Sequence, residues 1–330
     1  SIVSRNFYSL IIYLFLMLTV NSVESKDIID TDFNYKLGLG FNYSAISSYY
    51  DKDFKEKAEI EALRTLQFKT ENGDSSYTTL GDINIDYLEF HNDYFFEYKV
   101  YNDFVAELNL NIAYYSMDNS FTYKDTLRDE NQVPLEDKWG EKLFQRVDVP
   151  DLNVSLLRMM YVNPKINYYL ANDEKNRLEF ELEAFVPFSF NNTNVYEEGE
   201  FIGDGYFQIG SKLKYRAIFE TTQLELAAGY SHRSEVFSDM INASISILFT
   251  RVKDTYFYVK ADYNQSLTNP ENQKFIITQL PAYESYIATL FGLNVNIDEF
   301  ELDLNYTFIP YGRNFWLLNR LNASFHYFIK

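Results

Sequence analysis

The chain has 330 residues and a formal net charge of −19, and 46% of its residues are hydrophobic. The charge excludes a nucleic-acid-binding protein, since phosphates demand Lys and Arg, and the absence of cysteine excludes disulfides, thiolate metal sites and Cys nucleophiles. The mean hydropathy of −0.30 shows that apolar residues are distributed among polar ones instead of forming the long blocks that helical membrane spans require.

The N-terminal segment predicts export. Arg5 supplies a basic start, residues 7–20 form an apolar run of signal-peptide length, and Val23-Glu24-Ser25 offers small residues where a peptidase cleaves. We expect a signal peptide over 1–25, followed by one β-barrel domain over 26–330. The alternative is an N-terminal membrane anchor, for which the apolar run is short.

Four segments of the mature chain alternate apolar and polar residues over unusual lengths: 33–44, 104–114, 178–184 and 300–308. Period-2 alternation predicts strands with two different faces. Strands of soluble sheets are commonly five or six residues long, whereas many runs here reach about ten, which is the length a tilted strand needs to cross a bilayer.

Short and long connections alternate along most of the chain, as they do between the turns and loops of outer-membrane barrels. Aromatic residues such as Tyr43, Tyr98 and Tyr311 concentrate toward predicted strand ends, where amphipathic rings favour the headgroup level. We therefore predict an all-β, closed, antiparallel up-and-down transmembrane β-barrel of about twelve strands, with both termini periplasmic. The predicted strands are 32–47, 79–101, 104–117, 151–171, 176–190, 205–219, 222–232, 237–251, 254–266, 282–297, 299–310 and 314–330.

Two long connections complete the predicted barrel as external loops, near 48–78 and 118–150. Apolar residues at near-helical spacing predict a short surface helix over 53–68. Residues 118–150 are charged enough to form a plug or a surface cap. The strand over 79–101 requires an irregularity near His91-Asn92, where the alternation shifts.

The last predicted strand carries a resemblance to a known class. Asn322, Ser324, Tyr327 and Ile329 lie at the spacing of the C-terminal signal of bacterial outer-membrane β-barrel proteins, with Ser324 in place of the usual glycine and Lys330 after the last hydrophobic residue. The chain as a whole resembles this class by pattern. The resemblance implies the outer membrane of a Gram-negative cell, contact with lipid and lipopolysaccharide, and recognition by the barrel-assembly machinery.

The polar face of the predicted strands suggests a porin-like channel for small polar or charged solutes. Acidic and basic rows on neighbouring strands can set a transverse field across a water-filled lumen. The alternative remains open that the rows pair across the sheet in a packed lumen that conducts nothing. The candidate pore-lining residues are Glu179, Glu181, Glu183, Lys212, Lys214, Arg216, Lys260, Asp262, Glu301, Asp303 and Arg320.

Two further functions remain possible at this point. His232 and Ser234 resemble the His-x-Ser pair of the outer-membrane phospholipase, which implies a lipid hydrolase; Glu235 stands at the family's Asn position, and Asn242 is the nearest later amide. A surface-exposed binding or adhesion barrel would use the two long loops, which contain no calcium-loop or phosphate-loop motif. We predict no catalytic residue, no metal site and no cofactor.

Overall fold

A computed structural model describes the chain from residue 34 onward. The predicted signal peptide over 1–25 therefore lies outside the described residues. No helix in the described part is long and apolar enough to span a membrane. The described ranges are 34–50, 53–57, 59–70, 73–84, 87–101, 103–126, 134–135, 141–173, 175–188, 207–233, 238–252, 254–267, 284–313 and 315–329.

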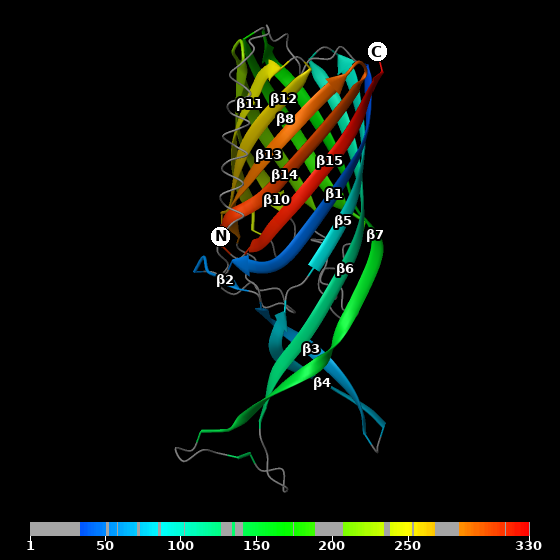
Figure 1. Ribbon diagram of the computed structural model, residues 1–330, viewed down its shortest axis with the longest axis vertical. Helices are drawn as coiled ribbons and strands as arrows, with labels where there is room; N and C mark the ends of the chain where they lie inside the picture. The colour runs from blue at the N-terminus through cyan, green and yellow to red at the C-terminus, as the bar shows by residue number, and fades with distance from the viewer. Residues whose placement is uncertain are drawn as a thin grey trace.

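Twelve antiparallel strands close into a barrel, which confirms the predicted fold class (Figure 1). Each barrel strand pairs with the next one in the chain, and β1 closes the ring because it pairs with β15 on one side and β5 on the other. The barrel strands are β1 (Tyr35–Tyr50), β5 (Tyr87–Tyr101), β6 (Phe104–Thr126), β7 (Phe144–Asn172), β8 (Asn176–Pro187), β9 (Gln208–Ile218), β10 (Thr222–Arg233), β11 (Met240–Val252), β12 (Thr255–Ser266), β13 (Ser285–Ile297), β14 (Phe300–Arg313) and β15 (Phe315–Ile329).

Both ends of the described chain lie at the same end of the barrel, together with the tight turns. The backbone N–H of Asn34 donates to the carbonyl oxygen of Ile329 at 2.8 Å. In the turn between β7 and β8, the carboxylate of Asp173 accepts the backbone N–H groups of Lys175 and Asn176 at 2.9 and 2.7 Å. These two donors hold the pKa of Asp173 below its ordinary value, since they stabilise the ionised form.

Side-chain alternation gives the barrel an apolar outer face and a polar inner face. On β1, Tyr35, Leu37 and Phe41 are exposed outward, whereas Ser44 is buried inside. The same alternation holds on β14, where Leu302 and Leu304 are exposed on the outside. An apolar outer belt around a polar interior is the arrangement that suits a barrel in a bilayer.

Aromatic rings pair across strands on this outer face toward both ends. Near the tight turns, Tyr35 stacks on Tyr98 at 5.0 Å between ring centroids. Toward the opposite end, Tyr43 packs on Phe90 at 4.9 Å. Such pairs stabilise neighbouring strands beyond simple burial, and their positions agree with the concentration of aromatic residues at strand ends.

The region before β5 differs from the prediction. The predicted strand 79–101 is two strands, β4 (Gly73–Asn84) and β5, and β5 continues without a register shift past His91. The predicted helix over 53–68 is wrong: β2 (Glu56–Lys57) and β3 (Glu59–Thr70) occupy this segment, and β3 pairs with β4 in a hairpin. Long-range pairing overrides the local helical spacing, since β3 and β4 pair from Glu59 opposite Asn84 to Thr70 opposite Gly73.

Residues 118–150 also contain more regular structure than the predicted loop. β6 continues to Thr126 and β7 begins at Phe144, so the two strands stay paired beyond the barrel wall. The β3–β4 hairpin joins this extension through three residues of β4 opposite β6. Together they form an extension at the end opposite the tight turns (Figure 1).

The lipid-facing belt can be tested by placing a charge at two depths. Ile245 lies near the middle of β11 and is 46% exposed, whereas Ile297 ends β13 and is 60% exposed. We expect Ile245→Arg to lower the free energy of unfolding by about 2–4 kcal/mol and Ile297→Arg by about 0–1 kcal/mol. Denaturant titration of the protein folded into lipid vesicles measures both values, and equal costs would contradict a depth-dependent apolar belt.

Candidate functional site

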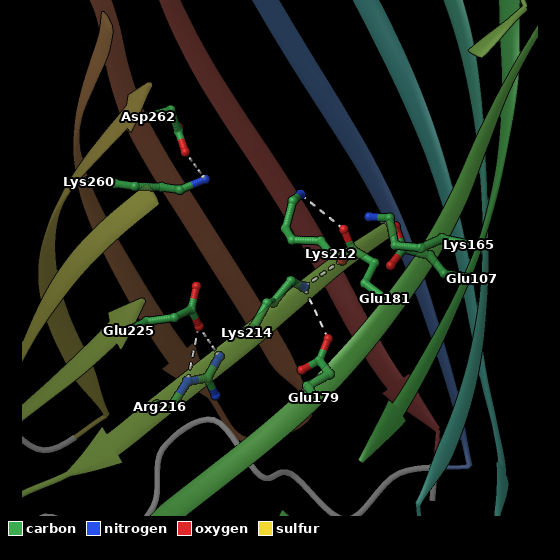
Figure 2. Close-up of polar contacts among 10 residues, drawn as sticks. All are labelled: Glu107, Lys165, Glu179, Glu181, Lys212, Lys214, Arg216, Glu225, Lys260 and Asp262. Carbon is green, nitrogen blue, oxygen red and sulfur yellow. Dashed lines mark hydrogen bonds and ion pairs between the residues drawn. The ribbon is translucent and has the colours of Figure 1, made fainter. Parts of the chain in front are cut away.

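The inner face carries a cross-strand ladder of ion pairs between β8 and β9 (Figure 2). Lys214 lies opposite Glu179 in the register, and its Nζ is 3.0 Å from Oε1 of that residue. Lys214 also donates to Glu181. Glu181 in turn accepts from Lys212 at 3.0 Å, and its side chain is only 4% exposed. Glu183 continues the acidic row opposite Gly210.

Two more ion pairs extend this ladder to the neighbouring strands. Arg216 on β9 donates from Nε and Nη2 to one oxygen of Glu225 on β10, at 3.1 and 2.6 Å. On the other side, Lys165 on β7 lies 3.2 Å from Glu107 on β6. We call the surface formed by β8, β9 and β10 the ion-paired wall, because Lys212, Lys214 and Arg216 of β9 each pair with a carboxylate on an adjacent strand.

This arrangement answers the question left open about the charged rows. Their side chains pair directly between neighbouring strands and do not face each other across the lumen (Figure 2). Adjacent opposite charges neutralise each other at short range, because Coulomb attraction is strongest there. The two rows therefore do not produce the predicted transverse field, although every residue in them lies on the inner face.

Some inward-facing charges retain considerable exposure. Lys260 and Asp262 on β12 pair at 3.0 Å and are 35% and 29% exposed. Arg320 on β15 is also 35% exposed; it lies 3.7 Å from Glu89 and donates to Ser44 at 2.8 Å. Since these side chains point into the barrel, their exposure requires solvent-sized space beside them.

The remaining two predicted residues, Glu301 and Asp303, lie on β14 in different surroundings. Glu301 accepts from His326 at 3.1 Å and lies 3.9 Å from Lys36. Among the described residues, Asp303 accepts hydrogen bonds from neutral groups alone: the Tyr258 hydroxyl is 2.9 Å from both of its oxygens. Three asparagine contacts complete this cluster, with Asn305 donating to Asp303 at 2.7 Å, Asn294 donating to it at 3.4 Å, and Asn322 donating to Asn305 at 2.5 Å.

A second neutral cluster surrounds Asp93 on β5, which the sequence reading did not select. Asp93 is 6% exposed and accepts from the amide groups of Asn42 and Asn111. The oxygen of Asn111 faces Nδ1 of His91 at 2.9 Å. Continuous alternation through residues 87–101 would have placed Asp93 on the inner face, but the assumed irregularity at His91-Asn92 concealed it.

The structure describes two residues of the hydrolase hypothesis, His232 and Asn242. His232 lies on the outer face at the end of β10, where its Nδ1 is 2.8 Å from Asp239, a partner that the sequence reading missed. The Tyr230 hydroxyl also donates to Asp239, and this bond above all lowers the pKa of that carboxyl. Asn242 instead faces inward beside Gly229. Ser234 and Glu235 lie outside the described residues.

Comparison with solved structures identifies the fold. The chain is similar to a crystal structure of an outer-membrane channel from Pseudomonas putida F1, with a TM-score of 0.53 and 9% identity over 92% of this chain and 99% of that one. The chain has the fold of a bacterial outer-membrane β-barrel. The CymD monoaromatic hydrocarbon channel (TM-score 0.43, 9% identity, 91% of this chain and 89% of that one) and the NanC porin (0.41, 7%, 82% and 99%) are more distant in structure. No family model and no curated protein matches the sequence.

One glycine shapes the inner face of the barrel. Gly292 on β13 lies opposite Tyr258, and a Cβ atom there would collide with the Tyr258 ring. The missing side chain therefore lets the tyrosine cross β13 and reach Asp303 on β14. Gly292 therefore allows the Tyr258 hydroxyl to lie where it donates a hydrogen bond to Asp303.

We expect Gly292→Val to displace Tyr258 and to lower the free energy of unfolding by about 1–3 kcal/mol, as overpacking does. Adding Tyr258→Ala removes the collision, so the cost of the valine should disappear in the double variant. Denaturant unfolding of the four proteins of this double-mutant cycle measures the coupling. A valine that costs the same with and without the tyrosine ring would contradict the close approach.

Proposed function

We propose that the protein is an outer-membrane channel for small polar or charged solutes. The observation that supports this proposal is the exposure of Lys260 and Arg320, both 35%, among side chains that point into the barrel. A lumen filled by side chains at the density of a protein interior would bury such charged groups. Space lined by charged groups fills with water, and water supports the passage of polar solutes.

The direction of the inner ion pairs supports an open path. Lys214 pairs with Glu179 on the adjacent strand, and Arg216 pairs with Glu225 on the other adjacent strand. Pairs of this kind lie along the wall, so these side chains do not bridge the lumen.

The proposed orientation places the tight turns and both chain termini in the periplasm. Outer-membrane barrels have short periplasmic turns and longer external loops. In this orientation the extension of β6 and β7, with the β3–β4 hairpin, faces the outside of the cell. The outer face would contact outer-membrane lipid and lipopolysaccharide, and the last strand, β15, would be read by the barrel-assembly machinery.

Conductance of the refolded protein in a planar bilayer tests the channel directly. We expect discrete, stable open steps, because a water-filled lumen conducts ions at any accessible voltage. The currents are recorded in symmetric salt. A heat-modifiability gel of the same sample shows that the protein is folded. A folded barrel without conductance would contradict the proposed function.

Charge reversal on β9 tests whether the ion-paired wall lines the conducting path. We expect Lys212→Glu, Lys214→Glu and Arg216→Glu to raise the cation preference of the open channel, since each adds negative charge to the lumen. The reversal potential across a salt gradient measures this preference. The exchange Arg216→Glu with Glu225→Arg is the control, because it keeps the net charge. Unchanged selectivity in all three reversals would contradict a pore-facing position.

A lipid hydrolase is a second candidate, favoured by the pairing of His232 with Asp239 on the outer face. A carboxylate that orients a histidine is part of the arrangement that activates a serine nucleophile. If this function is correct, the purified protein hydrolyses phospholipid in mixed micelles, and Ser234→Ala and His232→Ala each abolish the activity. Wild-type protein that leaves phospholipid intact contradicts this candidate.

A further inference from the structure

The inner face has a second wall whose chemistry differs from that of the ion-paired wall. It is formed by seven neighbouring strands: β12, β13, β14, β15, β1, β5 and β6. On these strands, neutral groups bind the two carboxylates Asp303 and Asp93. We call this surface the amide wall. Its members are Tyr258, Asn294, Asp303, Asn305, Asn322, Asn42, Asp93 and Asn111.

The negative charges of Asp303 and Asp93 are not neutralised by nearby cations. Among the described residues, all their hydrogen-bond donors are amides or a phenol, and neither carboxylate forms an ion pair with a Lys, Arg or His. Lys36 and Arg320 lie on the same wall, but they already face Glu301 and Glu89. A carboxylate solvated only by dipoles keeps its full charge, and its field therefore extends into the lumen.

Two buried carbonyl oxygens lie directly behind this acceptor surface. Asn294 is 1% exposed, and its Nδ2 donates to Asp303, while its Oδ1 has no hydrogen-bond partner among the described residues. Oδ1 of Asn322 is likewise buried without a partner there. A buried acceptor without a donor is costly, and a cation or an N–H group relieves that cost. Carboxylate and carbonyl oxygens are also the ligands that hard cations prefer.

The register places Asp303 and Asp93 at separate positions on the amide wall. Asp303 is on β14 and Asp93 on β5, and β15 and β1 lie between them. Three inter-strand spacings separate them by roughly 14 Å. The asparagines of the intervening strands lie in one row, with Asn322 paired to Asn305 on one side and to Asn42 on the other. The row offers a moving cation oxygen ligands between the two charges.

We propose that the amide wall makes the channel selective for small cationic solutes, which Asp303 and Asp93 bind in passing. This inference rests on the proposed channel function and specifies the charge class of its solutes. The preferred solutes are alkali cations and compounds that carry an ammonium group, since both satisfy carboxylate and amide oxygens. The net charge of −19 attracts the same class to the protein from a distance.

Reversal potentials in a KCl gradient test the selectivity. We expect the wild-type channel to prefer K⁺ over Cl⁻, and we expect Asp303→Asn and Asp93→Asn each to lower the permeability ratio roughly fourfold. One unit charge about 10 Å away in water changes the permeation of K⁺ and of Cl⁻ about twofold each, in opposite directions. The matched control is the double variant Arg216→Gln with Glu225→Gln, which removes a neutralised pair from the ion-paired wall and should leave the ratio unchanged. A wild-type channel without cation preference, or a ratio that both Asn variants leave unchanged, overturns the proposal.

Terbium luminescence provides a test that does not depend on conductance. Tb³⁺ bound at Asp303 would be sensitised by Tyr258, whose hydroxyl lies 2.9 Å from the carboxylate. We expect tyrosine-excited emission of the refolded barrel to fall in Asp303→Asn and to persist in the Arg216→Gln, Glu225→Gln control. Equal emission from wild type and Asp303→Asn overturns cation binding at this wall. A silent barrel contradicts the channel function, and the terbium result then decides the binding separately.

Discussion

Closure of the sheet is the constraint on which the rest of the structure depends, because hydrocarbon offers no partner to an unpaired backbone N–H or C=O. β1 satisfies this constraint by pairing along most of its length with β15 on one side and with β5 on the other. Once the ring is closed, side chains alternate between the outer face and the lumen. The apolar belt, the polar interior and the placement of every inward charge follow from that alternation.

The interior contains two ways of accommodating charge. On the ion-paired wall, Lys214 and Glu181 form an ion pair and neutralise each other's charge. This direct pairing offsets the cost of removing the two charged groups from water. On the amide wall, Asp303 is held by a phenol and by amides, so its charge remains. The difference matters for function, since only charge that is not neutralised locally acts on a passing solute. The 35% exposure of the Lys260 and Arg320 side chains leaves room for solvent beside them.

The strands outside the barrel do not take part in closing the sheet. β6 and β7 continue as a paired ribbon past the wall, and the β3–β4 hairpin attaches to it by a short stretch of pairing. The hairpin does not take part in closure, which explains why the up-and-down order survives its insertion between β1 and β5. It lies largely within 48–78, one of the two long connections that the surface-binding alternative would use.

The sequence by itself determined most of the barrel. Period-2 alternation located β6, β8, β10 and β12 to within a few residues at their starts, and it placed the charged residues on one face, because alternation is a local property of a strand. Only the tertiary structure decided that Glu59–Thr70 is a strand and that Asp93 belongs to the inner face. It also decided which carboxylate meets a cation and which meets an amide. Asn42 and Asp93 are 51 residues apart, and the register that joins them arises from the closed hydrogen-bond network of the whole sheet, which no local pattern encodes.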